Sequence, residues 1–228
     1  MSKTIKTIGM IIIGILLSIS ILVFSVDHYT FSSNYYVNKF VEFSVKDLSG
    51  LTDDGIVKAA DKLTKYLKYK NESLDLKLNI SGKIREVFNE KEKSHMVDVK
   101  NIFRNLNKFK DVSIGIIFLY LVLGLKYDFL RKKDIKNIFI VSFIFMLTIF
   151  IGLFILVNID FTKYFIKFHQ MFFSNKLWIL DPSKDVLIQL LPEQFFIDIT
   201  VKILELYGII TTTLTALVYL IYRHKFTS

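Results

Sequence analysis

Two histidines, His95 and His169, are the strongest candidates for chemistry in this chain of 228 residues. An imidazole has an ordinary pKa of about 6.5, so a pair of them can take a proton from one group and return it to another near neutral pH. Glu92 and Asp98 lie three residues on either side of His95, and on a helix either carboxylate could orient or charge-stabilise its ring. A single histidine more often packs or meets solvent, so the hypothesis requires both to share one site.

The stretch around His169 has the pattern of a helix that lies at a membrane surface. At helical spacing one strip is polar, with Lys163, Lys167, Gln170 and Ser174. The opposite face is aromatic, with Phe161, Tyr164, Phe165, Phe168 and Phe172. His169 projects between the two faces. Trp178 is predicted to anchor the loop that follows at the interface, and Asp181 is predicted to accept a hydrogen bond from its own turn before Pro182.

Composition indicates a membrane protein. Apolar residues make up 52% of the chain and the mean hydropathy is +0.44. The apolar residues gather in blocks long enough to cross a hydrocarbon layer of about 30 Å. We therefore predict a mainly α fold, a four-helix transmembrane bundle with spans at residues 8–26, 112–130, 137–159 and 196–222.

Basic residues in the short ends and loops predict the orientation, because short cytoplasmic segments are rich in Lys and Arg. The cytoplasmic side receives both termini and the loop 131–136, which together carry Lys3, Lys6, Arg131, Lys132, Lys133, Lys136, Arg223, His224 and Lys225. The outer side then receives a domain at 27–111 and a second loop at 160–195. His95 and His169 both lie in these outer segments, where the active site is expected.

The outer domain is predicted to be small, mixed α/β and dependent on the membrane or the second loop for its core. Residues 48–69 have helical spacing, with Asp53 or Asp54 as a possible N-cap. Residues 74–80 alternate strictly and stop at Ser81-Gly82, as a half-buried strand does, with either 35–45 or a piece near Val87 as its partner.

A helix is expected from about residue 89 into the second span. If that helix were straight, His95 would stand about 25 Å above the membrane, at about 1.5 Å per residue. An ester in the headgroup region would then be out of reach. We therefore expect the helix either to tilt along the surface or to break near residues 105–107.

Several classes of protein are disfavoured. The chain has no cysteine, which removes disulfides, a thiol nucleophile and Cys-based metal sites. Much of its net charge of +9 comes from the basic residues of the predicted cytoplasmic ends and loop. No groove of basic residues with interleaved aromatics accompanies this charge, so no nucleic-acid partner is expected. A metal-dependent membrane hydrolase stays open, although H-E-x-x-H is absent and His28 is the only third outer histidine. A non-catalytic scaffold or transporter subunit also stays open. No metal or cofactor is predicted.

Two motifs carry a resemblance to a known family. F-N-E-K-E-K-S-H-M-V-D-V-K precedes the second span and F-H-Q-M-F-F-S-N-K-L-W-I-L-D-P precedes the fourth, as residues 88–100 and 168–182. Together with the four-span layout they resemble the lipoprotein intramolecular transacylases, Lit. The resemblance implies a bacterial membrane enzyme that moves the sn-2 acyl chain of a diacylglyceryl lipoprotein to the α-amino group of its N-terminal cysteine, giving a lyso-form lipoprotein. It also implies that His95 and His169 are the catalytic pair, with Glu92, Asp98, Trp178 and Asp181 in supporting positions.

The proposed chemistry needs deprotonation, alignment and oxyanion stabilisation. A neutral imidazole can take the proton of an α-amino group whose pKa is about 7.7 to 8.0. Our hypothesis makes His95 the base, oriented by Asp98 or Glu92, and His169 the acid or oxyanion partner; the reverse assignment is equally compatible with the sequence. The expected partners are diacylglyceryl lipoproteins and membrane phospholipid, and the protein is expected to act as a monomer in the bacterial cell membrane.

Overall fold

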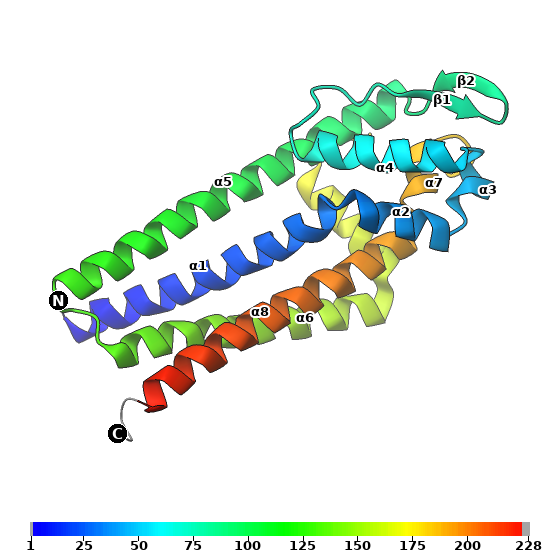
Figure 1. Cartoon of the computed structure of the whole chain (residues 1–228). Coiled ribbons are helices and arrows are strands. Elements are labelled where there is room, and N and C mark those ends of the chain that lie inside the picture. Colours follow the sequence, from blue (N-terminus) through cyan, green and yellow to red (C-terminus); the bar gives the residue numbers. More distant parts are fainter. Residues whose placement is uncertain (1, 225–228) are drawn as a thin grey trace. The chain divides into compact units, whose positions relative to one another are not determined.

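A computed structural model describes residues 2–224, without the side chains of 157 and 158. Lys225, predicted in the basic C-terminal tail, lies outside the described residues. The described chain is mainly helical (Figure 1), with the elements α1 Lys3–Thr30, α2 Ser33–Glu42, α3 Val45–Ser49, α4 Asp53–Leu67, β1 Lys77–Ile80, β2 Lys83–Glu86, α5 Glu90–Lys126, α6 Lys132–Phe172, α7 Val186–Leu190 and α8 Glu193–His224.

The chain divides into two compact units, which are described separately. The first comprises the described parts of Met1–Val26, Leu106–Asn158 and Val201–Ser228. The second comprises Asp27–Asn105 and Ile159–Thr200. The second unit thus combines the large segment that contains His95 with the later segment that contains His169.

Within the first unit, α1 packs against α5, α6 and α8. Met10 and Ile13 of α1 pack with Ile138 of α6 and with partly buried side chains of α5. Further along, Ile21 packs with Met146, Leu204 and Tyr207. Gly14 allows the close approach of α1 to α6, because a Cβ added there would lie 2.7 Å from the Cβ of Val141.

A buried polar contact also joins three helices of the first unit. The Ser18 hydroxyl donates to the Ser142 carbonyl oxygen over 2.9 Å and lies 2.5 Å from the Tyr207 hydroxyl. In an apolar layer such groups are stable only when they find partners on neighbouring helices, so the contact fixes how these helices meet.

Three helical segments in the described chain are long and apolar enough to cross a membrane: Lys3–Thr30, Lys132–Leu156 and Glu193–His224. They match the predicted first, third and fourth spans. The predicted second span falls on α5, whose uncharged run covers only residues 112–125. Fourteen residues rise about 21 Å, which is short of a hydrocarbon layer of about 30 Å. The second crossing, at residues 112–130, therefore stays a prediction.

In the second unit, β1 and β2 form an antiparallel hairpin, with Lys77 paired to Glu86 and Ile80 to Lys83. Ser81 and Gly82 both have positive φ, as the two-residue turn requires. Of the two predicted partners for the strand at 74–80, the one near Val87 is thus confirmed, as β2. The alternative, residues 35–45, is wrong as a strand because those residues are helical in α2 and at the start of α3.

The predicted helix 48–69 is α4, preceded by the separate short helix α3. Its N-cap is Thr52, whose hydroxyl accepts a hydrogen bond from the Gly55 N–H over 3.1 Å. The prediction of Asp53 or Asp54 as cap is wrong, since both lie in the first turn. There their charges still complement the helix dipole.

Of the two alternatives for the helix after residue 89, the break at residues 105–107 is wrong, because α5 is one helix of 37 residues from Glu90 to Lys126. The other alternative, a tilt along the membrane surface, stays a prediction. The long helix that breaks is α6, at Asp160, whose φ of −168° and ψ of 85° are extended. The Asp160 carboxylate accepts a hydrogen bond from the Lys163 N–H over 3.0 Å, as an N-cap does. Residues 161–172 therefore begin a new helical segment, which carries His169.

Candidate functional site

His95 and His169 lie side by side in the second unit. Their ring centroids are 6.1 Å apart and the rings are inclined at 35°. His95 is 6% exposed and His169 is 8% exposed, so both imidazoles are buried. His95 lies near the start of α5 and His169 in the segment of α6 after Asp160. The two histidines that the sequence paired are thus brought together from positions 74 residues apart.

Aromatic rings surround the pair. Phe173 lies 5.0 Å from the His95 ring and 5.6 Å from the His169 ring, measured between centroids. The Phe165 ring lies 4.3 Å from that of His169, and the Trp178 ring lies 5.0 Å from it at an angle of 31°. These rings replace water around the imidazoles, which favours the neutral over the charged form of each.

The His169 ring is held in one tautomer. Its Nδ1 lies 2.7 Å from the backbone carbonyl oxygen of Phe165, one helical turn earlier. A carbonyl oxygen only accepts, so Nδ1 must carry the proton and, in the neutral ring, Nε2 must carry the lone pair. Burial lowers the pKa of His169, and the bond to Phe165 opposes that effect. Nε2 of His169 is therefore an oriented proton acceptor.

His95 has a different setting. Its Nδ1 is buried and has no hydrogen-bond partner among the described residues. The pKa of His95 is lowered to about 4, mainly by burial and in addition by the charge of His169, while the Asp98 charge opposes both effects. Leaving a lone pair of Nδ1 without a partner costs less than leaving an Nδ1–H without an acceptor. The neutral His95 ring is therefore expected to carry its proton on Nε2. His95 is then a neutral ring with an N–H to donate.

Glu92 does not hydrogen-bond to either imidazole. Its carboxylate is 1% exposed and accepts from the backbone N–H groups of Asn89 and Leu187, each over 2.6 Å. The Asn89 side chain in turn accepts from the Glu92 N–H over 3.0 Å, which completes a capping box at the start of α5. Burial raises the pKa of Glu92, and these two backbone bonds oppose the rise. Glu92 therefore joins the start of α5 to α7.

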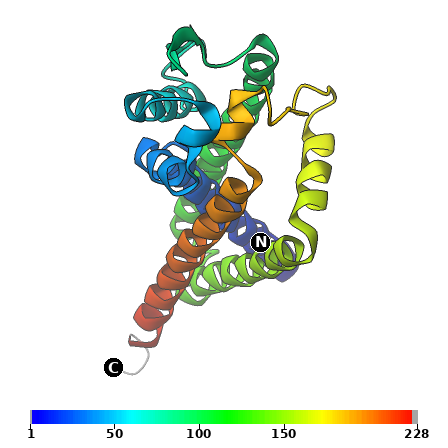
Figure 2. The same cartoon turned by 90° about the vertical axis from the view of Figure 1, so that its right-hand side faces the viewer.

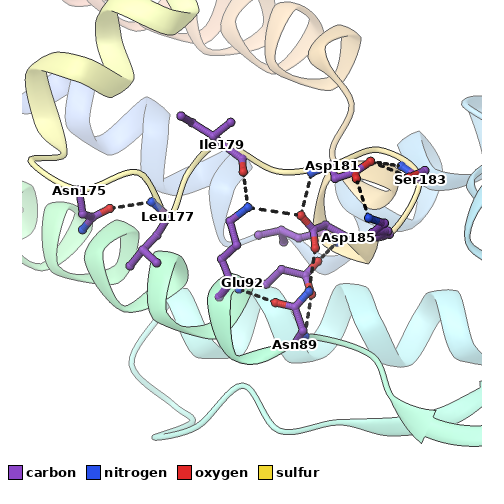
Figure 3. Close-up of polar contacts among 11 residues, drawn as sticks. Asn89, Glu92, Asn175, Leu177, Ile179, Asp181, Ser183 and Asp185 are labelled. Atoms are coloured by element: carbon purple, nitrogen blue, oxygen red, sulfur yellow. Dashed lines mark hydrogen bonds and ion pairs between the residues drawn. The ribbon is translucent and has the colours of Figure 1, made fainter.

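A second buried carboxylate, Asp185, extends this polar network (Figure 3). It accepts from the Asn89 amide and from the Asp181 N–H, each over 2.7 Å. The Lys91 ammonium lies 3.8 Å from it and also donates to the Ile179 carbonyl oxygen. The start of α5 is thus tied to the loop after α6 at several points. In the same unit α7 packs beside α3 (Figure 2).

Asp181 forms the turn that the sequence predicted. Its carboxylate accepts from the Ser183 N–H over 2.9 Å and from the Ser183 hydroxyl over 2.7 Å. These bonds lower the pKa of Asp181. In the described structure Asp181 makes no hydrogen bond to an imidazole, and its carboxylate is bonded within its own loop.

Asp98 and Trp178 meet at a residue that the sequence reasoning did not single out. The Asn175 amide donates to the Asp98 carboxylate over 2.8 Å. The Trp178 indole N–H donates to the Asn175 carbonyl oxygen over 3.1 Å. Four site residues were missed at the sequence level: Asn89, Phe173, Asn175 and Asp185. Phe165 was predicted on the aromatic face of its helix, but not as a partner of His169. Only Asn89 had a clear signal, as the first residue of the Asn-x-x-Glu capping box.

The sequence profile of the lipoprotein intramolecular transacylase Lit matches residues 11–196. This match covers most of the chain. The chain belongs to the Lit family. A comparison with curated protein sequences gives no significant match.

Solved structures agree with the Lit assignment. The in meso structure of the membrane integral lipoprotein intramolecular transacylase Lit from Bacillus cereus is 26% identical, has a TM-score of 0.74, and is matched over 98% of this chain and 96% of that one. A form of the same protein with one histidine replaced by alanine is 24% identical, has a TM-score of 0.77, and is matched over 99% of this chain and 97% of that one. This chain is therefore a membrane protein of a family of lipoprotein-modifying acyltransferases.

The described residues contain no group of three His, Cys, Asp or Glu side chains arranged to hold a metal ion.

Proposed function

We propose that this chain moves the sn-2 acyl chain of a diacylglyceryl lipoprotein to the α-amino group of that lipoprotein's N-terminal cysteine, using His95 and His169. The observation that carries the proposal is the pair itself. Two buried imidazoles from the two Lit-like motifs lie with centroids 6.1 Å apart in an aromatic shell. That spacing suits two groups that act on one ester and one amine.

The transfer balances without another reactant. The amine nitrogen bonds to the ester carbonyl carbon, the bond from that carbon to the glycerol oxygen breaks, and the proton lost by nitrogen ends on that oxygen. The products are an amide and a free 2-hydroxyl group. An amide is more stable than an ester, so no ATP is needed.

The settings of the two rings favour the reverse of the assignment first predicted. Nε2 of His169 is the oriented acceptor, because Nδ1–H donates to the Phe165 carbonyl. We therefore assign His169 as the base that takes the amine proton and returns it to the glycerol oxygen. His95, whose pKa is lowered to about 4, is a poor base. Its Nε2–H instead donates to the oxygen that becomes negative in the tetrahedral intermediate.

Burial supports this division of roles. In a site without water a hydrogen bond to a developing oxyanion is stronger than in solvent, and fixed donors need no reorganisation. The α-ammonium of the substrate also loses hydration there, which lowers its pKa and favours the nucleophilic neutral amine.

The membrane layout completes the proposal. We propose four crossings at residues 8–26, 112–130, 137–159 and 196–222, with both termini in the cytoplasm and the histidine pair on the outer side. The outer segments are 27–111 and 160–195, and 131–136 is the cytoplasmic loop. Both imidazoles come from one chain, which supports a monomer as the working unit, with lipoprotein and phospholipid as its partners.

Because the chain has no cysteine, single cysteines report this layout cleanly. Lys70→Cys should react with a membrane-impermeant maleimide in intact cells, and Lys133→Cys should react only after lysis. Labelling of Lys133→Cys in intact cells would contradict the proposed orientation.

The activity is tested by mass spectrometry of lipoprotein N-termini in cells with and without this protein. The wild type should convert diacylglyceryl termini to the N-acyl, S-monoacylglyceryl form, and His95→Ala and His169→Ala should not. His28→Ala is the matched control, since His28 contacts Tyr29 and not the pair. Unchanged termini with the wild type would overturn the activity. Conversion by both site variants would overturn the two-histidine mechanism.

A further inference from the structure

Asn175 connects the surroundings of the two histidines through three hydrogen bonds. Its side-chain amide donates to Asp98 over 2.8 Å. Its side-chain oxygen accepts from the Leu177 N–H over 3.0 Å, and its backbone carbonyl accepts from the Trp178 indole over 3.1 Å. Both the nitrogen and the oxygen of the Asn175 side-chain amide are therefore hydrogen-bonded.

The two ends of this connection are the two halves of the site. Asp98 lies one helical turn after His95 on α5, and its charge acts on that imidazole. Trp178 lies against the His169 ring, with centroids 5.0 Å apart. Among the described residues Asn175 makes no hydrogen bond to either imidazole, and its hydrogen bonds reach Asp98 and Trp178 instead.

We propose that Asn175 is a positioning residue that holds the loop after α6 against α5, so that Trp178 covers His169 while Asp98 stays beside His95. The part of this inference that concerns catalysis rests on the proposed function. The part that concerns the loop can be measured without it.

Asparagine suits this place because it donates and accepts at once. Its amide N–H groups meet the Asp98 carboxylate while its oxygen closes the turn at Leu177. Aspartate has the same shape but would present a second carboxylate to Asp98, and alanine would supply neither group. Asn175 is exposed, so its effect comes from geometry more than from stability. A misplacement of about 1 Å can lower a rate about 10²-fold.

Trp178 is the only tryptophan of the chain, so its fluorescence reports this loop alone. We would purify the full-length wild type, Asn175→Ala, Asn175→Asp and the double variant Asn175→Asp with Asp98→Asn. Ser174→Ala is the control, as an exposed neighbour outside the network. Two quantities are measured for each: acrylamide quenching of Trp178, and kcat and KM on a synthetic diacylglyceryl lipopeptide.

Asn175→Ala and Asn175→Asp should open the loop about fivefold more often, the factor that matches a lost hydrogen bond of about 1 kcal/mol. Quenching of Trp178 should rise accordingly. The fall should be in kcat, about tenfold, with KM nearly unchanged, because the residue orients groups and does not bind substrate. In the double variant the amide of residue 98 can donate to the carboxylate of residue 175, which is the reverse of the wild-type bond. This variant should therefore restore the shielding of Trp178.

Wild-type quenching and kcat in both single variants would overturn the inference. So would a double variant whose Trp178 stays as open as in Asn175→Asp. If the wild type fails to convert the lipopeptide, the proposed function fails, and quenching alone then decides whether Asn175 holds the loop.

Discussion

The surroundings of His95 and His169 differ although the two rings are neighbours. His169 donates from Nδ1 to the Phe165 carbonyl and so has one defined tautomer. His95 has a buried Nδ1 without a partner among the described residues, and burial lowers its pKa to about 4. Identical side chains thus acquire different proton chemistry. One hydrogen bond to the backbone decides which nitrogen can accept a proton.

The supports of the two histidines differ as well. The start of α5, which carries His95, is held by the buried carboxylates of Glu92 and Asp185. His169 is held by the rings of Phe165, Phe173 and Trp178. Substitutions in the polar network around α5 should destabilise the protein by leaving N–H groups without an acceptor. Substitutions among the rings around His169 should act by removing packing contacts, so the two sets of variants should have different effects.

The largest expected effect separates the roles of the two imidazoles. His169→Ala should lower kcat/KM about 10³-fold, as loss of a general base does, and His95→Ala about 10²-fold, as loss of one oxyanion donor does. His95→Gln keeps an N–H donor and should recover part of the rate, whereas His169→Gln should not. Steady-state kinetics on a diacylglyceryl lipopeptide measures this. Recovery by His169→Gln and not by His95→Gln would reverse our assignment.

The next effect tests the polar support of α5. Glu92→Ala leaves the buried N–H of Leu187 and the partly exposed N–H of Asn89 without their acceptor, and should lower stability by about 3 kcal/mol. Glu92→Gln keeps one acceptor and should cost about half as much. Thermal unfolding of the purified protein measures both. Glu90→Ala, at an exposed side chain in the same helical turn, is the control and should have little effect. An equal loss in Glu90→Ala would argue against the capping role.

A smaller effect concerns pH. The unfolded chain protonates His95 near pH 6.5, and the folded chain only near pH 4, because burial disfavours the charged ring. The stabilisation is complete above pH 6.5 and is lost as the pH falls toward 4, by about 3 kcal/mol at about 1.4 kcal/mol per pH unit. His95→Gln does not titrate, so its stability should fall less over this range. Parallel pH profiles of the two proteins would contradict the burial of a neutral His95.

The smallest effect tests the aromatic support of His169. Trp178→Phe keeps a ring but removes the indole donor to Asn175, and should lower kcat/KM less than about fivefold. Trp178→Ala should expose His169 and raise its pKa toward the ordinary value, while the pKa of His95 stays low. Histidine titration by NMR distinguishes the two rings. Equal changes at both rings would show that Trp178 covers the pair as a whole.

Local sequence patterns predicted much of the fold and the residues of the pair. Ser81-Gly82 predicted the hairpin turn, because few residues accept the positive φ that it needs. The apolar blocks predicted the three helices that are long and apolar enough to cross a membrane, because length and hydropathy are local properties. The break that was one of two alternatives for α5 occurs in α6 instead. Asn105 and Asn107 are tolerated inside α5, whereas Asp160 caps a new helical segment within α6.

The sequence alone determined which groups are available for chemistry: two imidazoles in Lit-like motifs, no thiol, and apolar segments that require a membrane. Only the tertiary structure decided what those groups can do. The contact between rings 74 residues apart, the bond from His169 to Phe165 and the use of Glu92 as a cap follow from which chain segments meet. A proton's position on an imidazole depends on its nearest partners and on its distance from water, and both are set by packing.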